Sequence, residues 1–203
     1  MDTKLKTKHF ALLAVNILAM VAFSVHFYSR ANYEFIIYIV AIALFLILIA
    51  VSVTKVPYTD ATLVGLTVWA IMHMAGGAIH IKGVLLYEII LIPLSKTYPI
   101  FRYDQLVHIW GFGAATLAMF CVLMPILKKD LGRHIALSVV VIMAGLGVGA
   151  FNEIVEALVT AVVPETGVGG YVNTALDLIS NFIGAIGAMI YIRIRYLTYD
   201  SQR

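Results

Sequence analysis

Cysteine and charge are the scarcest features of this sequence. Its only cysteine, Cys121, lies inside an apolar run, which excludes an intrachain disulfide and any cysteine-based metal or redox motif. Charged residues make up 12% of the 203 positions, whereas 62% are hydrophobic and the mean hydropathy is +0.98. A soluble domain carries roughly 25% charged residues. The composition therefore indicates a membrane protein.

Other absences narrow the function further. The net charge is only +3, and the basic residues flank apolar runs as membrane orientation requires, so nucleic-acid binding is not indicated. The glycine-rich stretch 167–170 lacks the Lys-Ser/Thr that follows it in a phosphate-binding loop. No internal repeat, low-complexity tract or domain linker is visible. We therefore expect one transmembrane domain over residues 1–203.

Long apolar runs fill most of the chain. A membrane-spanning helix needs roughly 20 mostly apolar residues. Six stretches meet this requirement, namely His9–Tyr28, Tyr33–Val53, Ala61–Ile81, Gln105–Leu127, Ile135–Val163 and Thr174–Tyr196. The sequence thus predicts an all-α, polytopic membrane bundle of six transmembrane helices. Gly145, Gly147, Gly149, Gly184 and Gly187 are interpreted as positions where these helices approach one another closely.

The lysines and arginines predict the orientation of the bundle. With the N-terminus inside, four of the 14 lie outside, namely Arg30, Lys82, Lys96 and Arg102. The other ten lie on the cytoplasmic side, namely Lys4, Lys6, Lys8, Lys55, Lys128, Lys129, Arg133, Arg193, Arg195 and Arg203. Because positive charge favours the cytoplasmic side, we expect a cell-membrane protein with both termini in the cytoplasm.

The connection from Lys82 to Arg102 is the longest between two predicted helices. Its apolar core, Gly83–Pro93, is too short to span a bilayer and ends in a proline. Such a run is typical of an interfacial or re-entrant segment, which we place on the outer face between helices three and four. Either it is a hydrophobic loop that packs on the bundle, or it is a lid or lipid-facing gate.

Polar residues concentrate at one depth of the predicted bundle. Residues three, four or seven apart share a helix face, and with the predicted orientation four helices bring such residues into the outer half of the membrane. The ionisable ones are His73, His80, Asp104, His108, Glu153, Glu156 and Asp177, and Asn181 accompanies them. Ionisable residues inside a membrane are expensive and are functional by default.

Buried carboxylates require compensation by protons, by cationic partners or by a metal ion. The apolar runs contain no lysine or arginine at this depth. Three histidines with four carboxylates form a ligand set suited to zinc, manganese or iron. We therefore favour a bound divalent metal. A metal-free proton or ion site and a purely structural polar network remain open.

The order of these motifs resembles that of the VanZ-like membrane proteins, over roughly residues 61–189. The motifs are Tyr103-Asp104-x-x-x-His108 with Gly111-Phe112, Asn152-Glu153-x-x-Glu156, and Asp177-x-x-x-Asn181-x-x-Gly184. The similarity is closest to the uncharacterised YjdF-type inner-membrane proteins, which also carry a segment like His73-Met74-Ala75-Gly76.

The resemblance implies a small polytopic membrane protein. For the member that gives the VanZ-like family its name, it also implies a link to tolerance of a glycopeptide antibiotic. It supplies no established reaction. The chain departs from the family at Glu156, where many members have glutamine, and after Pro164, where no arginine follows.

Three functions are compatible with the sequence. In the first, a metal held by His73, His80, His108 and Asp177 serves a hydrolase or transferase acting on a lipid or lipid-linked substrate, with Glu153 or Glu156 as general base. In the second, the same carboxylates bind a cation or proton in a transporter or channel. In the third, the cluster only specifies helix packing in a non-enzymatic envelope protein. The sequence leaves the oligomeric state open.

Overall fold

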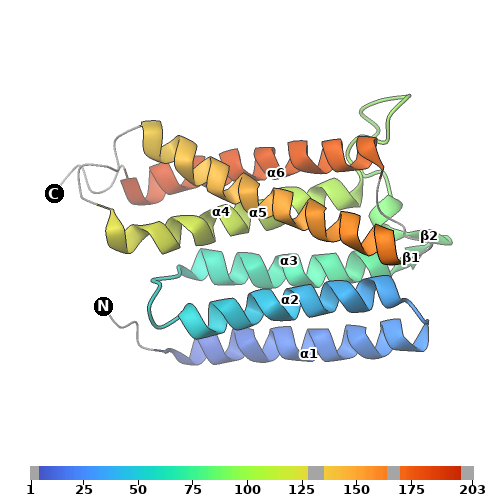
Figure 1. Cartoon of the computed structure of the whole chain (residues 1–203), viewed down its shortest axis with the longest axis horizontal. Helices are drawn as coiled ribbons and strands as arrows, with labels where there is room; N and C mark the ends of the chain where they lie inside the picture. Colours follow the sequence, from blue (N-terminus) through green and yellow to red (C-terminus); the bar gives the residue numbers. More distant parts are fainter. Residues whose placement is uncertain (1–4, 128–134, 164–169, 198–203) are drawn as a thin grey trace.

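The computed structural model of the chain describes residues 5–127, 135–163 and 170–197 (Figure 1). The predicted connections at 128–130 and 164–169 lie outside the described residues. So do five of the residues counted for the orientation, namely Lys4, Lys128, Lys129, Arg133 and Arg203.

Six helices run along the long axis of the bundle (Figure 1). They are α1 Thr7–Ser29, α2 Tyr33–Ser52, α3 Asp60–Ala78, α4 Tyr103–Leu123, α5 Ile135–Val162 and α6 Tyr171–Ile192. Each is long and apolar enough to cross a bilayer, which confirms the predicted six-helix architecture. A 3₁₀ turn, η2 Met124–Ile126, extends α4, and a π-helical turn, η4 Arg193–Leu197, extends α6.

The two ends of the bundle differ. α1 begins and α6 ends at one end, which we call the terminal end. A short β-hairpin lies at the opposite end, which we call the hairpin end (Figure 1). The side of the membrane that each end faces stays a prediction.

Small residues bring three helices close together around α4, which packs against α3, α5 and α6. A Cβ atom added to Gly184 of α6 would lie 2.2 Å from the carbonyl oxygen of Ile109 in α4. Gly145 and Gly149 of α5 face Thr116 and Asn181 at similarly short range. The packing interpretation is confirmed for these three glycines, and the backbones approach closely because no side chain separates them.

The same interpretation is wrong for Gly147 and Gly187. Among the described residues, a Cβ atom added to either would meet no atom within 4 Å apart from its own stretch of helix. Gly147 lies two positions from both Gly145 and Gly149 and so on another face of α5. Gly187 is exposed on α6.

The chain leaves α3 earlier than the sequence predicts. The helix ends at Ala78, and β1 His80–Ile81 pairs antiparallel with β2 Val84–Leu85. Lys82 and Gly83 form the turn, with positive φ angles of 53° and 83°, as a tight two-residue hairpin requires. The prediction that His73 and His80 share one helix face is therefore wrong, because His80 lies on an exposed strand.

The rest of the connection stays at the hairpin end and does not span the bundle. The 3₁₀ helix η1, Leu86–Glu88, places Tyr87 against the bundle, where its side chain is buried. The chain then returns to α4 through a bridge between Ile90 and Arg102 and a 2.8 Å hydrogen bond from the Tyr103 N–H to the Ile89 carbonyl oxygen. The segment packs on the bundle through Tyr87, while its apolar residues Ile90, Ile92 and Leu94 are exposed.

Candidate functional site

The first turn of α4 sets the position of the site. The Gln105 side chain accepts a hydrogen bond from the Arg102 N–H at 2.6 Å and so fixes where the helix begins. Asp104 follows in the first turn, where a carboxylate is favoured by the helix dipole. His108 lies one turn further on the same face, with its Nε2 atom 3.6 Å from Asp104 Oδ1.

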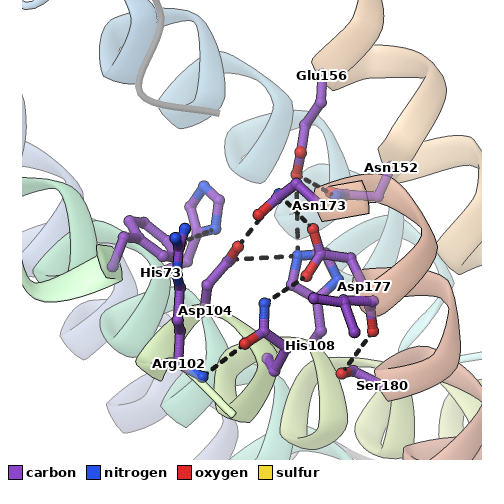
Figure 2. Close-up of polar contacts among 12 residues, drawn as sticks. His73, Arg102, Asp104, His108, Asn152, Glu156, Asn173, Asp177 and Ser180 are labelled. Atoms are coloured by element: carbon purple, nitrogen blue, oxygen red, sulfur yellow. Dashed lines mark hydrogen bonds and ion pairs between the residues drawn. The ribbon is translucent and has the colours of Figure 1, made fainter. Parts of the chain in front are cut away.

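Helix α6 supplies a second set of polar side chains. Asn181 Oδ1 lies 2.9 Å from His108 Nδ1. Asp177 lies one turn earlier in α6, and Figure 2 shows it beside His108. Gln105 donates a hydrogen bond to one Asp177 oxygen at 3.3 Å, and Asn173 donates to the other at 2.6 Å. The same Asn173 amide reaches Asp104 Oδ2 at 3.5 Å and so links α6 to α4.

Helix α5 completes the site from a third direction. Glu153 Oε1 lies 3.6 Å from His108 Nδ1, and Glu156 Oε1 lies 3.9 Å from His108 Nε2. Asn152 donates a 2.7 Å hydrogen bond to Glu156 Oε1 (Figure 2). Neither carboxylate oxygen of Glu153 has a hydrogen-bond partner among the described residues.

The resulting group of side chains, which we call the His108 cluster, is almost closed to solvent. It consists of residues that are each at most 8% exposed, namely Asp104, His108, Glu153, Glu156 and Asp177. In the part of the chain that the structure describes, no lysine or arginine forms an ion pair with these four carboxylates. Uncompensated buried charge is very costly, so protons or a metal ion must offset the negative charge of the cluster.

The ligand geometry of the cluster suits a metal ion. Asn181 Oδ1 can accept the Nδ1 proton of His108, which leaves the Nε2 lone pair directed to Asp104 and Glu156; metal-binding histidines are commonly held in this way. Two atoms bonded to one tetrahedral zinc ion at about 2.1 Å lie roughly 3.4 Å apart. The separations of 3.6 and 3.9 Å from Nε2 to the two carboxylates are close to this value.

His73 lies apart from the cluster. Its Nδ1 atom shares a 2.6 Å hydrogen bond with the Tyr87 hydroxyl. Four aromatic rings surround the imidazole with centroids 5.4 to 6.1 Å away, namely those of Phe35, Tyr38, Trp69 and Tyr87. Neither His73 nor His80 belongs to the two groups of described residues whose ligand atoms converge within 4.8 Å, whereas the other five predicted ligands do.

A small cavity of about 20 Å³ lies beside His73 and Asn152. Its lining includes Tyr38, His73 and Asn152. The Tyr38 hydroxyl is buried and has no hydrogen-bond partner among the described residues. A cavity above about 10–15 Å³ with two or more polar partners has room for one water molecule. This cavity therefore has the size and polarity to hold a water beside Asn152.

Sequence reasoning gave no role to four side chains that shape the site. Gln105, Asn152 and Asn173 donate hydrogen bonds to its carboxylates, and each lies within four residues of a predicted ligand. A search for amides next to intramembrane carboxylates would have found them. No sequence signal pointed to Tyr87, because its contact with His73 depends on the hairpin.

The fold and the cluster define a multi-pass membrane protein with a buried centre of carboxylates around one histidine. The chain belongs to the family described as "Predicted membrane protein (DUF2238)", whose model matches residues 9–197. The match reaches from the first turn of α1 to the end of η4 and includes every residue of the His108 cluster. No curated protein and no solved structure matches the chain.

Proposed function

We propose that the His108 cluster binds a divalent metal ion, zinc, manganese or iron, and that the protein is a metal-dependent hydrolase or transferase acting on a lipid or lipid-linked substrate. The observation that carries the proposal is that ligand atoms converge on His108 in two groups, one with Asp104 and Asp177 and one with Glu153 and Glu156, each within 4.8 Å. Imidazole and carboxylate donors suit these three metals.

The side chains divide into three roles. His108 would hold the metal, with Asp104 and Glu156 as carboxylate ligands from the two groups around it, and the metal would polarise the carbonyl or phosphoryl oxygen of the substrate. Asp177, already held by two amide donors, is a further ligand or supports Asp104 through the shared Asn173. Glu153 is the general base, because both of its oxygens are without hydrogen bonds among the described residues and can accept a proton.

Hydrolysis at this site requires one water molecule and no redox partner. The water oxygen bonds to the carbonyl carbon or phosphorus of the substrate, and the bond to the leaving oxygen breaks. Glu153 takes a proton from the water and returns it to the leaving oxygen, so the carboxylate is regenerated. In a transferase, an acceptor hydroxyl replaces the water with the same proton balance.

The surroundings of the cluster support a substrate that lies in the membrane. The cluster is buried among helices that are long and apolar enough to span a bilayer. A lipid can approach such helices sideways. With the predicted orientation, the cluster lies in the outer half of the cell membrane, and both termini are cytoplasmic.

A relationship to the VanZ-like proteins, and to their YjdF-type members, is part of the proposal. It is supported by the position of the motif residues, because all three motifs contribute a side chain to one cluster. An envelope-associated role follows for the chain if this relationship holds.

Transport of a cation or proton is the second candidate. The unbonded oxygens of Glu153 favour it, since a transported proton needs a free acceptor. Against it, the buried acidic and histidine side chains of the described residues all lie in the hairpin half of the bundle. Toward the terminal end, the buried Asn16 donates a hydrogen bond to Thr67, and each of them also donates to a backbone carbonyl oxygen. Neither side chain is ionisable, so this pair cannot accept and pass on a proton. We therefore place transport second.

The proposal is tested by the metal content of detergent-purified protein, measured by mass spectrometry without chelator present. We expect about one equivalent of zinc, manganese or iron in the wild type, since one imidazole and its carboxylates suffice for one ion. His108→Gln should abolish binding, and His80→Gln, on the exposed strand, is the matched control. Glu156→Gln and the exposed Glu88→Gln form a second matched pair.

The three readings give different outcomes. A metal-free wild type contradicts the proposal and directs attention to protonated carboxylates and transport assays. Size exclusion shows whether the His108→Gln variant is folded. If the folded variant still contains metal, the cluster does not bind it, and a structural role for the cluster is favoured. Loss of metal with retention of the fold supports the proposal, and lipid substrates can then be screened with the same variants.

A further inference from the structure

A second and much larger cavity lies on the side of the His108 cluster that faces the terminal end. Its volume is about 580 Å³, within the range of roughly 300–1,000 Å³ typical of small-molecule sites. Residues of α1 to α5 line it, and most are aliphatic or aromatic, such as Phe45, Leu66 and Val148. A cavity with such a lining does not hold water well.

The cavity is continuous with the surface of the bundle. Phe10 of α1, Leu48 of α2 and Val122 of α4 line it and are also exposed. These three helices are long and apolar enough to span a bilayer, so the medium outside this rim is the hydrocarbon of the membrane. A hydrocarbon chain can therefore enter sideways without crossing water.

The cavity meets the cluster at Asn152. This side chain lines the cavity and donates the 2.7 Å hydrogen bond to Glu156. Phe112 also lines it, and its ring lies 5.5 Å from that of His108. Val148 lies one helical turn before Asn152 and lines the same space. The mostly apolar cavity thus ends at Asn152, which is hydrogen-bonded to Glu156, a proposed metal ligand.

We propose that this cavity binds a hydrocarbon chain of the lipid substrate, with the bond to be cleaved or transferred at Asn152 and Glu156. The inference rests on the proposed function and adds the substrate class: a lipid whose reactive group is joined to a long apolar chain. Charged, water-soluble esters are poor candidates, because the lining is mostly apolar and contains no lysine, arginine, aspartate or glutamate among the described residues.

The two tryptophans of the chain provide the test. Trp69 lines the cavity, whereas Trp110 is exposed on the outer surface of α4. Trp110→Phe leaves Trp69 as the only reporter, and Trp69→Phe leaves Trp110. Each variant is reconstituted in vesicles of phosphatidylcholine with brominated acyl chains, because bromine quenches tryptophan fluorescence on contact. We expect both variants to lose most of their emission relative to unbrominated vesicles.

A matched pair of substitutions in α5 locates the quenching. Added to the Trp110→Phe background, Val148→Phe narrows the cavity next to Asn152 and should restore part of the Trp69 emission. Val140→Phe makes the same change at an exposed position that does not line the cavity, and the quenching should persist. Trp69 emission that brominated lipid leaves unchanged, while Trp110 is quenched, overturns the inference. Equal quenching in the two α5 variants overturns it as well.

Metal content, measured on the same samples, separates the two proposals. Quenching of Trp69 in a metal-free protein contradicts the metal-dependent enzyme but supports the cavity as a binding site for a hydrocarbon chain. Bound metal without quenching of Trp69 supports the metal site and contradicts the cavity as a lipid site.

Discussion

Two histidines on neighbouring helices of the hairpin half have opposite surroundings. His108 of α4 is surrounded by four carboxylates and an asparagine oxygen from α4, α5 and α6. His73 of α3 is surrounded by aromatic rings from α2, α3 and η1 and by one tyrosine hydroxyl. The first imidazole can balance negative charge or bind a metal, and the second serves packing and one hydrogen bond. The surrounding side chains thus determine which chemistry each histidine can perform.

The largest effect expected is on the free energy of unfolding when each histidine is replaced by leucine. His108→Leu removes the only basic group from a cluster of carboxylates, and breaking a buried charged pair costs about 3–5 kcal/mol. His73→Leu leaves the Tyr87 hydroxyl unbonded, which costs about 1–3 kcal/mol. Unfolding in lipid–detergent mixtures measures both. Equal losses would remove the distinction between the two histidines.

The second effect concerns the close approach of α4 and α6. Gly184→Ala places a methyl group against the Ile109 carbonyl oxygen, and overpacking of this kind costs about 1–3 kcal/mol. The helices must separate, so the metal site proposed for the His108 cluster should also bind metal more weakly. Gly187→Ala, three residues away with open space around it, should leave stability unchanged or raise it by up to about 1 kcal/mol. Similar behaviour of the two alanine variants would contradict the assigned packing.

The third effect is confined to the neighbourhood of His73. Tyr87→Phe deletes the hydroxyl that bonds His73 Nδ1 and should lower the free energy of unfolding by about 0.5–1.5 kcal/mol. Metal content should not change, because Tyr87 does not touch the cluster. Tyr98→Phe, at an exposed position of the same connection, is the control and should be neutral. Loss of metal in Tyr87→Phe would show that the two regions are coupled.

The smallest effect is a dependence on alkaline pH. Burial raises the pKa of Tyr87 well above its ordinary value. The folded state therefore keeps this proton at a pH where the unfolded chain loses it, and the contribution of Tyr87 to stability is constant below about pH 10 and falls above it. The stability difference between wild type and Tyr87→Phe should shrink above that pH. A difference that stays constant to pH 11 would contradict the burial of this hydroxyl.

The helices of this protein could be predicted from local sequence, but the C-terminal end of α3 could not. Six apolar runs became six helices because hydrocarbon allows no unpaired backbone groups, and a helix pairs them within one segment. The end of α3 was misplaced because a short apolar run is equally compatible with a strand. Lys82 and Gly83 turn the chain there, and this took His80 away from His73.

The sequence by itself determined that carboxylates, histidines and an asparagine lie at one depth of a membrane bundle, since helix length and periodicity set depth and face. Tertiary structure alone decided which of them meet. His108 and Asn181 are 73 positions apart, and their 2.9 Å contact depends on the close crossing of α4 and α6 at Gly184. The aromatic surroundings of His73 and the cavity beside Asn152 arise in the same way, because contacts between helices depend on packing that no local pattern encodes.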